Sequence, residues 1–563
     1  MDRKARDEAL SRAGKEIAAW RIPEADDVLQ ALPALPQRSL LLAETALLRG
    51  ETGKARTLAL EAERNGARPR ATREILRTLA AAGAKCFDET TPPIPVLHEL
   101  KPAVQVRWLP VLFDEERFSE IIDTAAGVLS GDPPEGVGAL AAYWDLQARY
   151  CLGEYETVVR RAEADARFAS TPCRMVATTA ALQLGDNQTA FRLFDLAHPT
   201  GEPPDFNPIH FNVTVRRRSV REAYCLYERD VTARGLREAL PATYCGDAVV
   251  LCDAAGAVLI ADFGVGDEIR HAAVYKELDA RSTSLTVTCD PRLQQLLARS
   301  VPRLSFMPVK RWRRETRVGR YAERAAVGAN IYCAMVLDDD SWQAVKRAPR
   351  IGGLAALIHT LESENATFRS ESSPYLRADP KRIAEMATRM APLRSGDTTL
   401  VGLCWRSILA STKRNARFTD ITAWHEVFLL KNIVFVNLQA RLTSDERALI
   451  RASGASFVEL DDIDLLDDFE AMAAVIATLD AVVARGNMAE LSGALGVPTF
   501  FLATTYESSW REGINGLDWW SGSREILVPV IPGDKNSTLA TLNKRLASFA
   551  AGDRRLNSTT EPR

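Results

Sequence analysis

The sequence contains no uninterrupted apolar stretch that approaches the roughly 20 residues needed for a membrane-spanning helix. Its first residues, MDRKARDEALSRAGKEI, are charged and lack the apolar segment of a secretion signal, so we expect a cytoplasmic protein without a membrane span. A surplus of basic charge is also missing, because 71 Lys and Arg residues face 74 Asp and Glu residues. Binding to nucleic acids or to anionic membranes usually needs such a surplus, so neither is expected as the main task.

Patterns for metal binding and for disulfides are absent as well. The nine cysteines are scattered and form no Cys-x-x-Cys pair, and none of the six histidines sits in a metal-ligand spacing. The acidic run at 338–340 precedes Ser341 and Trp342 in an apparent turn that opens a helix, where acidic residues are common. No Gly-x-Ser-x-Gly elbow and no phosphate-binding P-loop occurs. We therefore predict reduced thiols, no metal and no cofactor.

The residues up to about 230 have apolar side chains at helical spacing, with few strand-like runs. Three breaks look alike: at Gly50, Gly153 and Gly185 a helix is predicted to end, and a second helix with small residues on one face follows. Gly153 and Gly185 lie 32 positions apart, close to the period of about 34 residues in tetratricopeptide repeats. The spacing favours a helical-repeat solenoid over 1–235 that binds a polypeptide partner, and an ordinary all-α domain is the alternative.

A second pattern begins near residue 243, where short apolar runs alternate with helix-like stretches. Strands are predicted at 248–252, 257–261, 285–288, 304–307, 400–404, 433–437, 481–484 and 499–502. Helices are predicted at 291–298, 423–430, 444–452, 468–479, 487–495 and 538–549. Such alternation implies parallel strands with helices on both faces. The predicted fold class is thus α + α/β, with a helical-repeat domain at 1–235 and two Rossmann-like doubly wound domains at 236–396 and 397–563. A ligand cleft is expected at the carboxyl ends of their strands.

Candidate chemistry follows the predicted strand ends. Gly264 and Gly266 would let backbone N–H groups approach a ligand, and Asp267 in the first helical turn would either accept a proton as a general base or cap the helix. A loop after the strand at 400–404 is rich in hydroxyl groups and cations, which suit a diphosphate, although a solvated basic loop has the same composition. Its candidate diphosphate contacts are Arg406, Ser407, Lys413 and Arg417.

A further strand end offers backbone N–H groups at Asn487, Met488 and Ala489 that would hold the same diphosphate. The ribose or the base would lie against Gln439 or against the turn at Asp461-Asp462. Each of these assignments competes with a purely structural role for the same residue.

Seven short motifs occur in order between residues 243 and 549. They are Gly264-x-Gly-Asp-Glu-Ile269, Cys289-Asp-Pro-Arg-Leu293, Arg299-Ser-x-Pro302, Cys404-Trp-Arg-Ser407, Phe435-Val-Asn-Leu-Gln439, Leu479-Asp-Ala-Val-Val483 and Gly493-Ala-Leu-Gly496. Together they resemble bacterial tetratricopeptide-repeat glycosyltransferases, which are similar to O-linked N-acetylglucosamine transferases and to flagellin glycosyltransferases of the GT-B fold.

The resemblance implies an inverting, metal-independent GT-B enzyme. It would move a hexosyl- or nonulosonyl-type sugar from a nucleotide-sugar donor to Ser or Thr of an acceptor protein, with flagellin as one candidate acceptor. The helical domain would bind that acceptor and the last domain would bind the donor. By the same resemblance Asp267 becomes the candidate base, Gln439 a nucleotide contact, and Arg406, Ser407 and Lys413 phosphate contacts. In the absence of a metal, cations and helix N–H groups must stabilise the leaving diphosphate.

The sequence departs from the family pattern just before Gly493. The family usually has a Ser or Thr and then a His there, whereas this chain has Gly-Asn-Met-Ala-Glu at 486–490. Glu490 would repel a phosphate unless it is protonated or paired. The departure leaves two alternatives open beside protein glycosylation. One is a non-catalytic repeat scaffold with a degenerate GT-B half, and the other is a transferase that acts on a glycan or lipid acceptor.

Overall fold

The chain falls into two compact units. The first unit comprises Met1–Ala148, Val231–Tyr244 and Val309–Ala348, and the second comprises Arg149–Asp230, Cys245–Pro308 and Pro349–Arg563. The computed structural model describes residues 2–18, 21–81, 94–201, 203, 205–261, 264–311, 335–337, 339–361, 374–407, 417–512 and 516–556.

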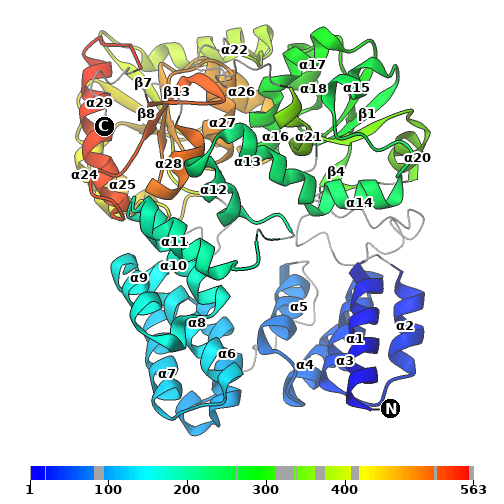
Figure 1. The fold of residues 1–563 in the computed structure, drawn as a ribbon. Coiled ribbons are helices and arrows are strands. Elements are labelled where there is room, and N and C mark those ends of the chain that lie inside the picture. Colours follow the sequence, from blue (N-terminus) through cyan, green and yellow to red (C-terminus); the bar gives the residue numbers. More distant parts are fainter. Residues whose placement is uncertain are drawn as a thin grey trace. The chain divides into compact units, whose positions relative to one another are not determined.

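The first unit is mainly helical (Figure 1). Its helices are α1 (Arg3–Ala18), α2 (Ile22–Gln30), α3 (Pro36–Arg49), α4 (Thr52–Arg64), α5 (Pro69–Ala81), α6 (Pro102–Asp114), α7 (Phe118–Ser130), most of α8 (Glu135–Cys151), α14 (Val231–Ala239) and α20 (Asp339–Arg347). Two short antiparallel strands, β4 (Lys310–Arg311) and β5 (Met335–Val336), accompany them. Small residues let α3 and α4 approach closely, because Ala43, Ala46, Ala55 and Ala59 are all buried in one cluster.

The three predicted glycine breaks are confirmed. Gly50 follows α3 with φ +79°, and α4 begins two residues later. Gly153 (φ +82°) separates α8 from α9 (Tyr155–Ala164), and Gly185 (φ +76°) separates α10 (Thr171–Gln183) from α11 (Asn187–Ala197). Glycine is favoured at each site because it adopts the left-handed conformation without a Cβ penalty. The repeat solenoid itself, its partner and the domain boundaries at 235/236 and 396/397 stay predictions.

The helices of the second unit that precede residue 231 are packed against its later part. They are α9 to α11 with α12 (Pro208–Arg217) and α13 (Val220–Cys225). Their main contact is α28 (Thr505–Arg511): the Tyr506 N–H donates to Gln183 Oε1 at 3.2 Å, and Arg216 Nη2 donates to the Thr505 carbonyl at 2.9 Å. These helices therefore share a core with the α/β part of the chain.

The first sheet of this unit is fully parallel, with the order β3-β2-β1-β6. Its strands are β1 (Ala257–Ile260), β2 (Leu285–Cys289), β3 (Ser305–Pro308) and β6 (Ile351–Gly353). The accompanying helices are α15 (Ala248–Asp253), α16 (Val265–His271), α17 (Tyr275–Arg281), α18 (Gln294–Ser300) and α21 (Leu354–Leu357). In register, Val258 of the central strand β1 lies opposite Thr286 on one side and Ile351 on the other.

The strand prediction at 248–252 is wrong, because this segment is helix α15. Asp247 caps it by accepting hydrogen bonds from the N–H groups of Val249 (2.8 Å) and Val250 (3.0 Å). Ala248, Leu251 and Cys252 are buried while the two valines are exposed, which is helical periodicity. A short apolar run does not by itself distinguish a strand from a helix.

The second sheet has the order β12-β13-β11-β10-β7-β8-β9, and only β12 is antiparallel to its neighbour. Its strands are β7 (Thr399–Cys404), β8 (Ile433–Asn437), β9 (Phe457–Val458), β10 (Ala481–Ala484), β11 (Thr499–Leu502), β12 (Leu517–Asp518) and β13 (Ser521–Leu527). Its other helices are α22 (Pro380–Met390), α24 (His425–Phe428), α25 (Ser444–Ala452), α26 (Phe469–Ala477), α27 (Asn487–Ala494) and α29 (Thr538–Ala550). Without β12, the sheet has the Rossmann strand order 3-2-1-4-5-6.

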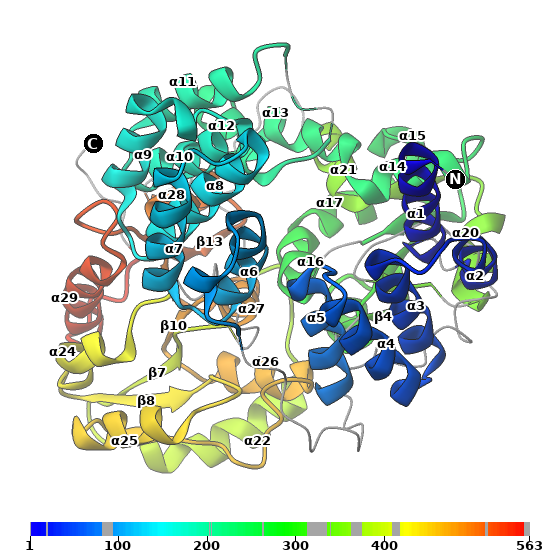
Figure 2. The ribbon, with the colours of Figure 1, turned by 90° about the horizontal axis from the view of Figure 1, so that it is seen from below.

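Alternate residues of these strands face different helix layers. Val401 and Leu403 belong to the cluster with α24 and α29, whereas Leu400 and Cys404 belong to the cluster with α26 and α27. Figures 1 and 2 show the two layers on opposite sides of the sheet. The predicted succession of a helical region and two Rossmann-like sheets is thus confirmed.

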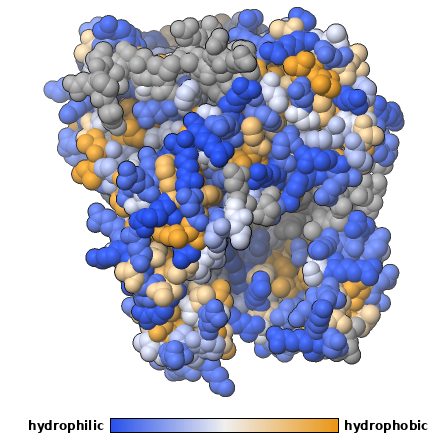
Figure 3. Space-filling view, in the orientation of Figure 1, coloured by the Kyte–Doolittle hydropathy of each residue, from blue (hydrophilic) through white to orange (hydrophobic). Residues whose placement is uncertain are grey.

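On the face in Figure 3 hydrophilic residues predominate, and apolar residues form small separate groups. Among the described helices, none combines the length and the apolar composition that crossing a bilayer requires. The seven cysteines within the described ranges are free thiols.

Candidate functional site

The strand order of the second sheet defines where a ligand is expected. The chain proceeds outward from β7 in one direction and from β10 in the other, and these two strands are neighbours. Open α/β sheets bind ligands at the carboxyl ends of the strands that flank such a switch point. Here those ends are Cys404 and Ala484, which lie opposite each other in register. The residues that follow them, 405–407 and 485–487, therefore form the candidate ligand segment.

Helix α16, which follows β1 of the first sheet, contacts this segment through a glycine. A Cβ on Gly266 would lie 2.6 Å from Oδ1 of Asn487, the first residue of α27. The Cα of Asn487 would lie 3.7 Å from that Cβ, so the first turns of α16 and α27 are in close contact, and glycine leaves room there for the exposed Asn487 side chain. Gly264, by contrast, has φ −66° and open space where its Cβ would be. Of the predicted glycine pair, Gly266 thus lies at the contact between α16 and α27, which brings the segment after β1 close to the segment after β10.

Asp267 lies in the first turn of α16 with 41% of its side chain exposed. It does not cap the helix, because Gly264 is the N-cap and receives no side-chain hydrogen bond. Its carboxylate instead accepts a hydrogen bond from Arg270 Nη2 at 2.6 Å. The neighbouring His271 is a poor proton acceptor, because burial and the Arg270 charge lower its pKa well below the usual value and its ring is not accessible.

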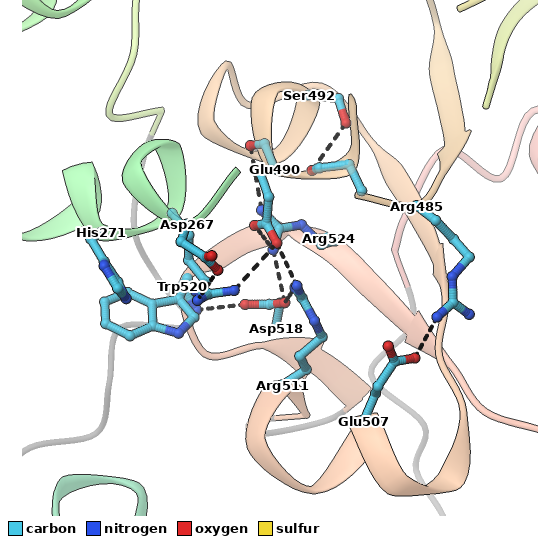
Figure 4. Close-up of polar contacts among 12 residues, drawn as sticks. Asp267, His271, Arg485, Glu490, Ser492, Glu507, Arg511, Asp518, Trp520 and Arg524 are labelled. Atoms are coloured by element: carbon cyan, nitrogen blue, oxygen red, sulfur yellow. Dashed lines mark hydrogen bonds and ion pairs between the residues drawn. The ribbon is translucent and has the colours of Figure 1, made fainter. Parts of the chain in front are cut away.

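Behind Asp267 lies a buried group of charges, which we call the arginine cluster: Arg270, Glu490, Arg511, Asp518 and Arg524. Figure 4 shows Glu490 directed at Arg511 and Arg524, with Asp518 beside both arginines. Glu490 Oε1 lies 2.5 Å from Arg511 Nη2 and 3.7 Å from Arg270 Nη1, and its Oε2 lies 2.9 Å from Arg524 Nη1. Asp518 Oδ2 accepts from Arg524 at 2.9 Å and from Arg511 at 3.2 Å. The cluster joins α16, α27, α28, β12 and β13.

The electrostatics of the cluster explain how Glu490 is tolerated at the position where the sequence departs from the pattern of the family that it resembles. Burial alone would raise the pKa of Glu490, but the charges of Arg511, Arg524 and Arg270 outweigh burial and lower it to about 2. Glu490 is therefore ionised and paired, and it does not present an isolated charge to a phosphate. Gly493 makes room for this arrangement, since a Cβ there would lie 2.6 Å from Arg524 Nη2.

A second buried ion pair lies at the end of β10. Arg485 Nη2 contacts Glu507 Oε2 at 2.5 Å. The backbone N–H of Arg485 donates to the Cys404 carbonyl at 3.0 Å. Burial would raise the pKa of Glu507, but Arg485 and Arg417 lower it to about 2. Arg417 Nη1 lies 3.9 Å from Glu507 Oε1, with its guanidinium 5.6 Å from the centre of the Tyr506 ring. Of the predicted phosphate contacts, Arg417 thus lies beside the end of β10.

Two other predicted donor contacts make internal hydrogen bonds. Arg406 binds both oxygens of Glu446 at 2.7 Å and also donates to the Arg441 carbonyl. Gln439 is 1% exposed, and its Oε1 accepts from the backbone N–H of Arg406 at 3.2 Å. Ser407 is half-buried at the end of the same segment. Lys413 lies outside the described residues.

The predicted N–H segment lies at the start of α27. Asn487 is exposed, whereas Met488 and Ala489 are buried in the core between the two sheets. The side chains of Met488 and Ala489 therefore pack inward, and what they offer a ligand is the backbone N–H groups of the first helical turn. Within the described ranges, no group of three or more His, Cys, Asp or Glu side chains is placed to hold a metal ion.

Arg270, Arg511, Asp518 and Arg524 were not among the site residues predicted from the sequence. The sequence held a signal for two of them, because Arg511 directly follows Trp510 and Asp518 directly precedes Trp519 and Trp520. The Trp510 ring lies 5.0 Å from the Arg270 guanidinium and 4.5 Å from that of Arg511. Arginine beside tryptophan in a loop region suits stacked, buried guanidinium groups.

Comparison with protein families gives no match. Among curated proteins, the chain is similar to Protein FlbA of Caulobacter vibrioides, with 28% identity over 295 residues. The match covers 51% of this chain and 46% of FlbA, so it spans about half the length of that relative.

Solved glycosyltransferase structures show low similarity to the chain. A family 9 glycosyltransferase from Veillonella parvula has a TM-score of 0.38 and 10% identity, covering 54% of this chain and 98% of its own. The E. coli heptosyltransferase WaaC with ADP has a TM-score of 0.32 and 14% identity, covering 52% and 99%. A mutant O-GlcNAc transferase from Thermobaculum terrenum has a TM-score of 0.26 and 13% identity, covering 81% and 95%. Likenesses of this size do not define the activity of the chain.

Proposed function

We propose that the chain is a glycosyltransferase that uses a nucleotide-sugar donor. The observation that carries the proposal is the contact of α16 with α27, which sets a partly exposed carboxylate, Asp267, next to the switch point of a Rossmann-ordered sheet. The N–H groups at Asn487 to Ala489 would receive the diphosphate, with Arg417 as a nearby cation. Asp267 would take the proton of the acceptor hydroxyl as that oxygen attacks the sugar carbon.

The finer parts of the proposal follow from the sequence resemblance. The transfer would be inverting and metal-independent, the acceptor would be Ser or Thr of a protein such as flagellin, and the N-terminal helices would bind that protein. With one base and no covalent intermediate, a single displacement inverts the sugar carbon. The leaving diphosphate would be stabilised by helix N–H groups and cations in place of a metal.

A panel of nucleotides tests the proposal. Purified protein is heated with ADP, UDP, GDP, CDP, dTDP or CMP, and the matching sugar donors are then supplied with candidate acceptors. We expect one nucleotide to raise the melting temperature, since a ligand at a hundredfold excess over its Kd stabilises the native state by about 2.7 kcal/mol. Asp267→Asn should retain nucleotide binding and lose about 10²- to 10⁴-fold in transfer rate. Asp253→Asn, on the exposed end of α15, is the control. If no nucleotide binds and no sugar is transferred, the proposal is wrong.

A non-catalytic scaffold is the second candidate. The observation that favours it is the internal engagement of Arg406 with Glu446 and of Gln439 with the backbone of Arg406, which removes two predicted donor contacts. A scaffold requires neither nucleotide binding nor Asp267. Under this alternative, Asp267→Asn would leave the cellular phenotype of a complemented deletion strain unchanged, whereas the enzyme proposal predicts its loss.

A further inference from the structure

Glu490 stands where the sequence departs from the pattern of the family that it resembles, and its side chain is bound by arginines. Glu490 lies on α27 and is 2% exposed, and three guanidinium groups converge on its carboxylate. Two of them, Arg511 and Arg524, also share Asp518. The third, Arg270, has two acidic partners within the described residues: Glu490 on one side and Asp267 on the other.

The arginine cluster together with Asp267 contains three guanidinium groups and three carboxylates, so its charges balance. Arg270 is almost completely buried and lies against the Trp510 ring. Loss of a carboxylate partner strongly destabilises a buried guanidinium unless another anion replaces that partner. Among these carboxylates, Asp267 has the exposure to move, because 41% of its side chain is in contact with solvent.

We propose that Glu490 is a positioning residue for Asp267, acting through Arg270. Glu490 neutralises part of the Arg270 charge, so that Asp267 makes one hydrogen bond to Arg270 and remains partly exposed. Without Glu490, Arg270 would draw the Asp267 carboxylate inward. The catalytic meaning of this positioning depends on the proposed function, in which Asp267 must reach an acceptor hydroxyl. The orientation of Asp267 does not depend on that function.

Carboxylate labelling measures the orientation directly. The full-length protein is treated with a water-soluble carbodiimide and an amine, and the labelling rate of Asp267 is read by peptide mass spectrometry. We expect Glu490→Gln to slow the labelling by about threefold, the size of change that one partly exposed ion pair supports. In Glu490→Gln combined with Arg270→Gln, the pull on Asp267 is gone and the rate should return to the wild-type value or exceed it.

Two variants keep the test decisive. Glu525→Gln removes another buried glutamate of the second sheet, one paired with Arg545 at 2.8 Å, and should leave Asp267 labelling unchanged. Arg270→Gln alone should raise the labelling of Asp267, and this readout remains if Glu490→Gln fails to fold. Unchanged Asp267 labelling in a folded Glu490→Gln variant, unchanged labelling in Arg270→Gln, or a double variant as protected as Glu490→Gln overturns the proposal.

Kinetics separate this inference from the function on which its meaning rests. If the protein transfers sugar, Glu490→Gln should lower kcat while the Kd for the nucleotide stays unchanged. The double variant should show at least as much Asp267 labelling and at least as high a kcat as Glu490→Gln alone. If the labelling follows the expected pattern and no donor is transferred, the positioning role stands and the glycosyltransferase proposal fails. If transfer is observed and Asp267 labelling is the same in Glu490→Gln as in wild type, the positioning role fails alone.

Discussion

At the residue scale, the candidate site depends on glycines that make room for charged or polar neighbours. Gly266 admits Asn487, and Gly493 admits the guanidinium of Arg524. Arg524 is completely buried and bonded to Asp518, so it has little freedom to move aside. Gly493, which belongs to one of the family-like motifs, therefore makes room for a buried arginine side chain.

Gly493→Ala tests this reading. The new Cβ would lie 2.6 Å from Arg524 Nη2, so we expect a loss of about 1–3 kcal/mol in the free energy of unfolding, as for other overpacked sites. Urea denaturation measures it. The matched control is Gly127→Ala, within α7, where no atom lies within 4 Å of the added Cβ. That change should be neutral or stabilising by up to about 1 kcal/mol. Equal effects of the two substitutions would contradict the packing role of Gly493.

At the element scale, α28 connects two parts of the second unit. Toward the helical region, its Thr505 carbonyl accepts from Arg216 and its Tyr506 N–H donates to Gln183. Toward the sheet, Glu507 pairs with Arg485 and Arg511 pairs with Glu490. One helix thus pairs with Arg485 in the candidate ligand segment and with Glu490 in α27, and it also contacts α10 and α12.

Helix α15 shows how a cap decides the type of an element. Asp247→Ala should reduce stability by about 0.5–2 kcal/mol, because the N–H groups of Val249 and Val250 lose their acceptor. Thermal or urea unfolding of the full chain gives the value. Asp253→Ala, at the exposed other end of the helix, serves as the control and should change stability by less than about 0.5 kcal/mol. A stability loss below that of the control would show that the cap is dispensable.

At the scale of the second unit, two family-like motifs join the two sheets. Arg292, in the motif at 289–293, donates to Asp467 at 2.9 Å and to the Leu466 carbonyl at 3.1 Å. Arg299, in the motif at 299–302, contacts both oxygens of Glu470 at 2.7 Å. All three acceptors lie just before α26 or in its first turn. These arginines hold the parts of the two sheets together on the side of α26.

A double-mutant cycle measures this connection. Arg299→Ala, Glu470→Ala and the combination should give a coupling energy of about 1–3 kcal/mol in urea unfolding, because the Glu470 carboxylate is mostly buried and bound through both oxygens. The exposed pair Arg389 and Asp462 provides the comparison and should give a clearly smaller coupling energy, because solvent screens its charges. If the two cycles give the same energy, Arg299 contributes no more than a surface ion pair.

Most of the helices and strands that were predicted correctly were predicted from apolar periodicity and from the residues at turns. The glycine breaks at Gly50, Gly153 and Gly185 and the strands β7, β8, β10 and β11 were predicted, because left-handed caps and buried apolar runs are encoded by neighbouring residues. The strands β9, β12 and β13 of the same sheet were not predicted. The segment 248–252 was misjudged because the run of apolar residues was too short to show its period and the cap at Asp247 was overlooked.

The sequence by itself determined the order of helices and parallel strands, and with it the strand ends where a ligand is expected. Only the tertiary structure decided which side chains meet there. Arg406 pairs with Glu446, and Glu490 pairs with arginines that lie up to 220 residues away in the chain. Pairing between distant charges depends on how the sheets and helices pack, and no local pattern in the chain records that packing.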